Sequence, residues 1–133
     1  MLTKAEYEAT VCERLSSAQP VPFRRVSFVK GDCPQEGHCH ENVERYVAEN
    51  PGTSVLRGWL PYHQIWDNGV KQRLTSHSVV RGINGELFDI TPFGNNDHRD
   101  KLVFVPHLGD EQEFSAMGRF VDCPCEVEVL QAF

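Results

Sequence analysis

The dipeptide Asn84-Gly85 is the feature that most restricts how this chain can fold. It stands between residues 70–81 and residues 86–90, two segments rich in β-branched and apolar side chains. Asn-Gly between such segments is a strong short-range signal of a β-hairpin, because both residues tolerate the positive φ angles that a tight turn requires. We therefore predict that these two segments are neighbouring antiparallel strands.

Other segments predict further strands. Residues 54–66 have the composition of a strand, and a turn at residues 67–69 joins them to the hairpin. The three strands then form an antiparallel meander. Shorter strands are predicted at residues 26–29, 102–105 and 127–130.

Two helices are predicted ahead of the meander. In residues 3–17, Thr3 and Glu6 have the spacing of a capping box, and apolar residues recur four apart. A second helix begins near Cys39 and runs to about residue 49. Because the helices come first and the strands follow, we predict an α+β fold in which N-terminal helices pack on an antiparallel sheet. A length of 133 residues fits a single domain over residues 1–133.

Composition excludes several classes of partner. The net charge of −6 disfavours binding to the phosphate backbone of a nucleic acid. No apolar run approaches the ~20 residues of a membrane span, and residues 1–9 lack the apolar core of a secretory signal. Five cysteines is an odd count, which argues against a closed disulfide framework. We therefore predict a cytoplasmic protein with reduced thiols, in which Cys12 lies beside the apolar face of the first helix and serves packing.

Cys39, His77 and Asp89 have the residue types and the order of a nucleophilic triad. A thiol attacks only as thiolate, and both a helix N-terminus and a nearby imidazole favour that form. Cys39 lies at the start of the second predicted helix, and His77 lies on the central predicted strand. Asp89, on the next strand, is placed to orient His77. The backbone N–H of Cys39 is a candidate donor to an oxyanion.

The triad depends on the length of the turn at Asn84-Gly85. A strict two-residue turn would put Asp89 opposite Val80, on the other face of the sheet from His77. A three-residue turn with a glycine bulge at Gly85 restores a common face, so the triad requires that bulge.

The segment that runs from His77 through Asn84-Gly85 to Asp89 resembles the histidine hairpin of NlpC-type cell-wall peptidases. Residues 89–92, Asp-Ile-Thr-Pro, are similar to the Asp-x-Thr of the transglutaminase-like core, and Gly58-Trp59 also suits that group. The resemblance is to the papain-like and transglutaminase-like superfamily of cysteine hydrolases. It implies a papain-like or transglutaminase-like layout and the order cysteine, histidine, polar orienter.

The resemblance covers roughly residues 37–92 and has clear departures. NlpC-type enzymes have Asp before the cysteine and Ser-Gly after it, whereas this chain has His38-Cys39-His40-Glu41. No glutamine stands where a papain-type oxyanion donor is expected; Gln35 is the nearest, at the wrong spacing. The resemblance therefore implies a superfamily layout and no particular substrate.

Three further residues are candidates for substrate contact. His40 follows the proposed nucleophile and either modifies the thiol or grips a substrate, although an exposed first-turn position is the simpler interpretation. Asn42 lies about one turn after Cys39, where it either binds a polar substrate group or packs the helix start. If the turn at residues 67–69 has three residues, Trp59 lies opposite His77 and shields it from water.

A metal site is the main alternative. Cys33, His38, Cys123 and Cys125 offer the four ligands of a structural zinc, which would make the chain a zinc-stabilised interaction domain without catalysis. Their spacings match no common zinc finger, and Cys123-Pro124-Cys125 is otherwise two thiols on a loop. The acidic residues 109–113 are interpreted as a solvated loop rather than a calcium site.

The sequence thus predicts a cysteine-dependent hydrolase or acyl transferase that acts on an amide or ester bond, with no cofactor. A peptidase, an amidase and a deamidase share the first step, in which the thiolate attacks a carbonyl carbon. The partner would be a peptide, a protein or a small amide substrate. A small binding module with incidental thiols remains an alternative, as does the zinc-stabilised domain.

Overall fold

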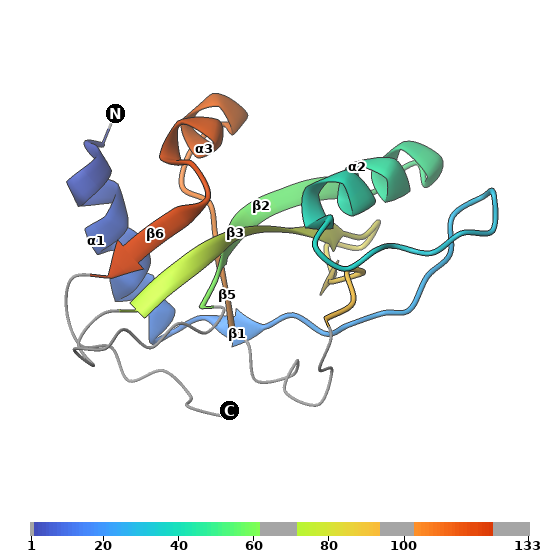
Figure 1. Cartoon of the computed structure of the whole chain (residues 1–133), viewed down its shortest axis with the longest axis horizontal. Helices are drawn as coiled ribbons and strands as arrows, with labels where there is room; N and C mark the ends of the chain where they lie inside the picture. The colour runs from blue at the N-terminus through green and yellow to red at the C-terminus, as the bar shows by residue number, and fades with distance from the viewer. Residues whose placement is uncertain (1, 62–71, 94–102, 124–133) are drawn as a thin grey trace.

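A computed structural model describes residues 2–61, 72–93 and 103–123. Helices and strands are combined in an α+β fold, as predicted (Figure 1). The elements in chain order are α1 (Lys4–Leu15), β1 (Gln19–Pro20), α2 (Cys39–Glu49), β2 (Ser54–Leu60), β3 (Gln72–Arg81), β4 (Leu87–Phe88), β5 (Val103–Pro106), α3 (Glu111–Met117) and β6 (Phe120–Cys123).

The strands form one antiparallel sheet in the order β1-β5-β2-β3-β4, with β6 also paired to β3. Strand β2 pairs along one edge of β3, from Thr75 to Arg81. The other edge of β3 is shared: β6 pairs at its start, over residues 72–75, and β4 pairs at its end, over Val80 and Arg81. Residues 76–79 therefore lie between the two partner strands on that edge.

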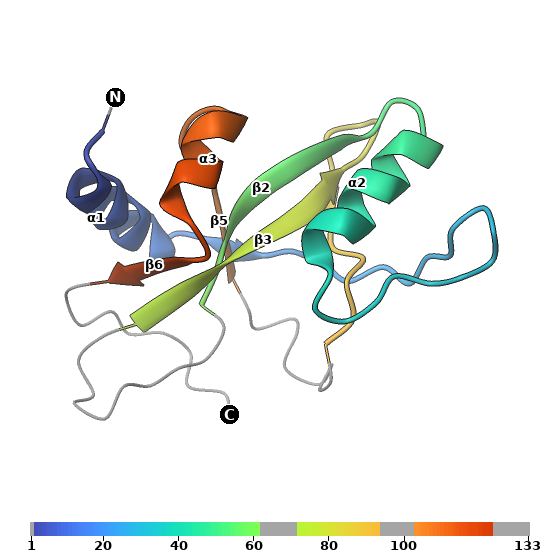
Figure 2. The same cartoon turned by 45° about the horizontal axis from the view of Figure 1, so that its top comes forward.

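The helices cover the sheet in two places. Helix α1 packs against β5 and β6, and α2 lies over β2 and β3 (Figures 1 and 2). The N-terminus of α1 has the predicted capping box, in which Thr3 Oγ1 accepts from the Glu6 backbone N–H and Glu6 accepts from the Thr3 N–H. Val43 of α2 is fully buried against Val80 and Ile90, which fixes α2 on the face of the sheet that carries Val80.

The turn between β3 and β4 has three residues. The Gly82 N–H donates to the Glu86 carbonyl at 2.7 Å, so that residues 83–85 form the loop. Gly85 has φ 84°, a left-handed conformation that is unfavourable for residues with a Cβ. The pairing of Val80 with Phe88 then puts Asp89 on the same face as His77, which is the arrangement that the triad requires.

The register between β2 and β3 differs by one residue from our prediction. Gly58, not Trp59, lies opposite His77, and Trp59 lies opposite Ser76. Trp59 is fully buried on the other face, where its indole N–H donates to the Tyr7 hydroxyl at 2.8 Å. It therefore does not shield His77, and its assignment to the substrate site is wrong.

Several predicted segments also differ. Residues 26–29 form no strand; instead Phe23 makes a parallel bridge to Asp89. The acidic segment forms the start of α3, because Asp110 and Glu113 make a second capping box. The strand predicted at residues 54–66 ends at Leu60 in the described part of the chain, and the strand predicted at residues 127–130 lies outside the described residues.

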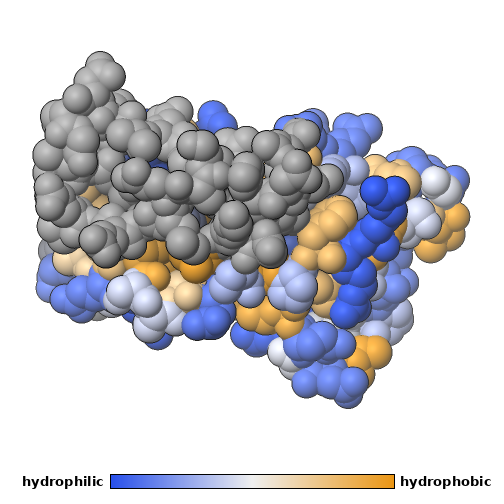
Figure 3. Space-filling model, turned by 90° about the horizontal axis from the view of Figure 1, so that it is seen from below, coloured by the Kyte–Doolittle hydropathy of each residue, from blue (hydrophilic) through white to orange (hydrophobic). Residues whose placement is uncertain are grey.

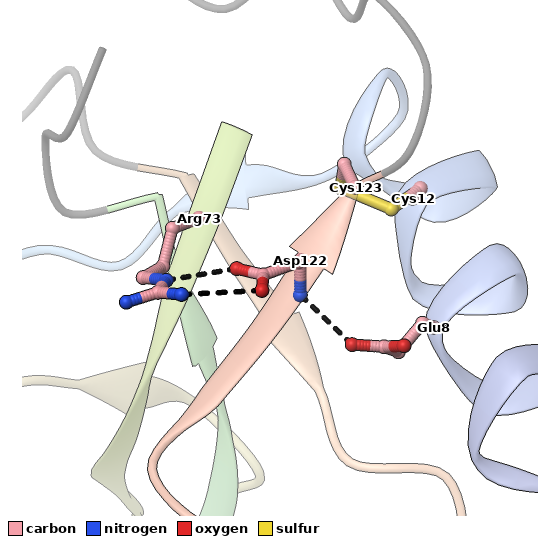
Figure 4. Close-up of a disulfide and its surroundings, with 5 residues drawn as sticks. All are labelled: Glu8, Cys12, Arg73, Asp122 and Cys123. Atoms are coloured by element: carbon pink, nitrogen blue, oxygen red, sulfur yellow. Dashed lines mark hydrogen bonds and ion pairs between the residues drawn. A yellow bond between two sulfur atoms is a disulfide. The ribbon is translucent and has the colours of Figure 1, made fainter. Parts of the chain in front are cut away.

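A disulfide joins Cys12 of α1 to Cys123 at the end of β6 (Figure 4). The prediction that all cysteines are reduced is therefore wrong for this pair. Beside it, Glu8 accepts from the Asp122 backbone N–H, and the Asp122 carboxylate pairs with Arg73 of β3 (Figure 4). Side-chain contacts thus connect α1, β6 and β3 in one unit.

On the face seen from below, hydrophobic and hydrophilic residues are interspersed over the described part of the surface (Figure 3). The large hydrophobic side chains exposed among the described residues are Leu2, Val29 and Ile83. Within those same residues, no helix has both the length and the apolar character that crossing a membrane requires.

Candidate active site

Cys39 is the first residue of α2, and its side chain is half-buried beside β3. The thiol Sγ lies 4.0 Å from the backbone carbonyl oxygen of Ser76. Residue 76 begins the stretch of β3 edge that neither β4 nor β6 pairs in the described structure. The side chain of the N-cap residue His38 makes no capping hydrogen bond to the helix backbone. The positive end of the helix dipole is therefore directed at the thiol without a competing side-chain cap.

His77 and Asp89 form a buried pair, and each is only 4% exposed. His77 Nε2 lies 2.5 Å from Asp89 Oδ2. The other carboxylate oxygen, Oδ1, accepts from the Thr91 backbone N–H at 3.0 Å. With Nε2 held by the carboxylate, Nδ1 is the ring nitrogen of His77 that is left for the thiol.

The backbone around Asp89 holds this pair in place. The Asp89 N–H donates to the Pro22 carbonyl, and the Asp89 carbonyl accepts from the Arg24 N–H, each at 2.8 Å. On the histidine side, the rings of Phe93 and Phe104 lie 5.9 and 6.4 Å from the imidazole, measured between ring centroids. The carboxylate and the imidazole are thus fixed by main-chain hydrogen bonds and by aromatic packing.

Gly58 makes room for that packing. A Cβ on Gly58 would lie 2.4 Å from Phe104 Cζ and 2.4 Å from the Val105 carbonyl oxygen. Since Gly58 lies opposite His77, the missing side chain allows the Phe104 ring to reach the histidine.

The electrostatics favour a thiolate beside an imidazolium. Burial raises the pKa of Cys39, but hydrogen bonding to His40 and His77 and their charges outweigh it and lower the pKa to about 6. Burial lowers the pKa of His77, but its bonds to Asp89 and Cys39 and their charges raise that pKa to about 9. Between these values the ion pair of Cys39 thiolate and His77 imidazolium is the main form.

A cavity of about 680 Å³ opens at this pair and is lined by Cys39, His77 and His40. Its apolar wall comes from Leu60 and Phe93, and its polar wall from residues that include Thr75, Thr91 and Ser115. Three charged residues are also among those that line it: Glu36, Glu41 and Arg119. A substrate in this space would contact the thiol directly.

His40 lies over the face of β3 opposite to His77. Its Nδ1 is 2.6 Å from Ser78 Oγ, and its Nε2 is 3.3 Å from Ser76 Oγ. Because successive side chains of a strand alternate between faces, the two imidazoles approach Cys39 from opposite sides of β3. His40 is thus half-buried in a polar network rather than an exposed first-turn residue.

Asn42 is not placed to bind a substrate. It is 6% exposed, and its amide donates to the Gln35 carbonyl and to Thr91 Oγ1, while its oxygen accepts from the Gln35 N–H. These bonds tie the loop before α2 to the segment after β4. Asn42 therefore holds the two segments that carry Cys39 and Asp89.

The proposed zinc site is not assembled. Cys123 is bound to Cys12 in the disulfide, so it offers no thiolate to a metal. Cys33 is exposed, and His38 pairs with Glu41 at 3.5 Å. Cys125 lies outside the described residues. Among the residues that the structure describes, no group of three or more metal-ligating side chains comes together.

Sequence reasoning missed Arg57. On β2, its guanidinium donates to Ser78 Oγ at 2.9 Å and is held by Glu44 of α2 and Glu111 of α3. Arg57 could be found only from its position opposite Ser78 on the neighbouring strand. That position depends on the register of β2 against β3.

Comparisons of the chain with protein-family models, with curated proteins and with solved structures find no match.

Proposed function

We propose that this chain is a cysteine-dependent hydrolase or acyl transferase that acts on an amide or ester bond, with Cys39 as nucleophile, His77 as acid and base, and Asp89 as orienter. The observation that carries the proposal is that a thiol at a helix N-terminus and an imidazole line one cavity, and that a buried carboxylate is bound to that imidazole. No shared structural task explains these three groups. Together they are the parts of an activated nucleophile.

The reaction follows from these parts. The Cys39 thiolate attacks the carbonyl carbon; a C–S bond forms, and the π electron pair moves to the carbonyl oxygen. The first-turn N–H of Cys39 is a donor to that oxyanion. When the tetrahedral intermediate collapses, the bond to the leaving group breaks, and the His77 imidazolium protonates the leaving amine or alcohol. Neutral His77 then takes a proton from water or from an acceptor amine as its oxygen or nitrogen attacks the acyl carbon. The C–S bond breaks, the acyl group leaves on that oxygen or nitrogen, and the Cys39 thiolate and the His77 imidazolium are restored.

The cavity narrows the class of substrate. A volume of about 680 Å³ fits a small molecule or a single side chain of a protein. An amidase, a deamidase or an acyl transferase needs such a compact pocket, whereas a peptidase needs an extended cleft. The mixture of Leu60 and Phe93 with polar residues favours an acyl group that has an apolar part. We therefore favour a small amide or a protein side-chain amide as substrate.

The order of cysteine on a helix, histidine on a strand and carboxylate beyond the next turn also supports a papain-like or transglutaminase-like layout, which we propose on that order alone. The cytoplasmic location stays a prediction. The Cys12–Cys123 disulfide favours an oxidising compartment instead, because such bonds persist mainly there.

The test is acylation by an activated ester. The protein is mixed with p-nitrophenyl acetate and quenched, and peptide mass spectrometry locates the acetyl group. We expect a burst of p-nitrophenol and an acetyl thioester on Cys39. Cys33, an exposed free thiol in the same chain, is the internal control. Equal acetylation of Cys33 and Cys39, with no burst, would contradict the proposal.

A further inference from the structure

Two hydrogen-bond donors meet the same nitrogen of His40. Ser78 Oγ lies 2.6 Å and Arg57 Nη1 3.4 Å from His40 Nδ1. Arg57 is a donor only, and it also donates to Ser78 Oγ at 2.9 Å. We assign Nδ1 as the accepting nitrogen, because the donor-only Arg57 Nη1 lies 3.4 Å from it, and Nε2 then carries an N–H.

Arg57 holds this arrangement firmly. Its side chain is only 14% exposed and pairs with Glu111 at 2.8 Å and with Glu44 at 3.3 Å. Because Nδ1 of His40 faces Ser78 and Arg57, Nε2 is the ring nitrogen of His40 that is left for another partner.

Nε2 of His40 lies 3.3 Å from Ser76 Oγ, which is long for a hydrogen bond, and both residues line the cavity. His40 lines the same cavity as Cys39 and lowers the pKa of the Cys39 thiol by hydrogen bonding. His40 is thus close enough to the Cys39 thiolate to interact with its negative charge. During attack on a carbonyl, that charge passes from sulfur to oxygen.

We propose that His40 is a catalytic residue whose Nε2–H, together with the Cys39 backbone N–H, binds the oxyanion of the tetrahedral intermediate. This inference rests on the proposed function and adds to it a side-chain donor. Arg57 and Ser78 are positioning residues, because they fix the tautomer of His40 without reaching the reacting atoms. An N–H donor that is held in place suits this task, because it stabilises the charge that develops on the oxyanion.

Two reagents measure two different properties of the site: the reactivity of the Cys39 thiol and the binding of an oxyanion. Iodoacetamide alkylates the thiolate by displacement of iodide and forms no oxyanion. With phenylacetaldehyde, the thiolate adds to the carbonyl carbon. The carbonyl oxygen then gains the negative charge and binds in the oxyanion site. Its affinity is measured by the protection that it gives Cys39 against iodoacetamide.

The variants are His40→Ala, which removes the donor, and His40→Gln, which keeps an N–H at a similar reach. His38→Ala is the matched control, because His38 is a neighbouring histidine that pairs with Glu41 instead. We expect His40→Ala to weaken aldehyde binding by about 10- to 100-fold, with alkylation changed only a few-fold where Cys39 is thiolate. His40→Gln should restore much of the affinity, and His38→Ala should match the unaltered protein.

Unchanged aldehyde binding in His40→Ala would overturn the inference. An equal loss of aldehyde binding and of alkylation would also overturn it, because His40 would then affect only the reactivity of the Cys39 thiol. Circular dichroism of each variant checks that it is folded. If Cys39 of the unaltered protein is alkylated no faster than Cys33, the proposed function fails as well, and the inference fails with it.

Discussion

The two carboxylate oxygens of Asp89 have different partners. Oδ2 faces His77, and Oδ1 accepts the Thr91 N–H. The charge of Asp89 stabilises the imidazolium, while its geometry fixes which ring nitrogen is left for Cys39. A neutral amide in its place would keep much of the shape and lose the charge.

We therefore predict that Asp89→Asn lowers the pKa of His77 from about 9. The imidazolium is present below the pKa of His77 and is lost as pH rises through it, so the alkaline limb of the activity profile should move toward neutral pH. The Cys39 pKa should rise from about 6, because the charge that lowers it is weakened. The rate at the optimum should fall by about 10- to 100-fold. The measurement is the pH profile of p-nitrophenyl acetate hydrolysis.

Asp122→Asn is the control for this variant. It removes a carboxylate that pairs with Arg73 and lies on β6, away from His77. If the acid and alkaline limbs of the pH–activity profile stay in place in Asp89→Asn, Asp89 does not set the pKa of His77.

Among the elements, the turn between β3 and β4 controls the site most directly. Its three residues put Asp89 and His77 on one face, and a change of one residue in the register would separate them. Gly85 permits this turn through its φ of 84°. The turn therefore links backbone conformation to the chemistry of the cavity.

We predict that Gly85→Ala destabilises the protein by about 1–2 kcal/mol, because a Cβ is unfavourable at positive φ. Gly85→Asn should cost less, since Asn tolerates the left-handed region. Chemical denaturation measures both variants. Equal stability of Gly85→Ala and the unaltered protein would mean that the turn does not require this conformation in solution.

Elements with strong local signals were predictable from the sequence, and cross-strand register was not. The capping box of Thr3 and Glu6 and the Asn84-Gly85 turn are encoded by neighbouring residues, and both are confirmed. The register of β2 against β3 depends on how the segment between them closes, which no local pattern specifies. Trp59 was therefore placed on the wrong face, and Arg57 was missed.

At the scale of the whole molecule, the disulfide connects the first helix to the last described strand. Cys12 and Cys123 are 111 residues apart, and both side chains are buried. The odd number of cysteines does not indicate that these two are bonded, because the contact of α1 with β6 is set by the tertiary fold. Strand β6 pairs with β3 immediately before His77, and the adjacent Arg119 borders the cavity.

We predict that reduction of this disulfide lowers the free energy of unfolding by roughly 2–4 kcal/mol, because the open chain gains conformational entropy when it unfolds. Urea denaturation with and without reductant measures the change, and a Cys12→Ala/Cys123→Ala variant should match the reduced protein. Identical midpoints in both conditions would contradict a stabilising disulfide.

The most direct test of the central claim is the rate of iodoacetamide alkylation at Cys39 as a function of pH. Cys33 in the same molecule is the reference, and His77→Ala is the comparison variant. We predict that Cys39 reacts with an apparent pKa of about 6 and that this low pKa is lost in His77→Ala. Alkylation of Cys39 that follows the profile of Cys33, or that is unaffected by His77→Ala, would contradict an activated thiolate at this site.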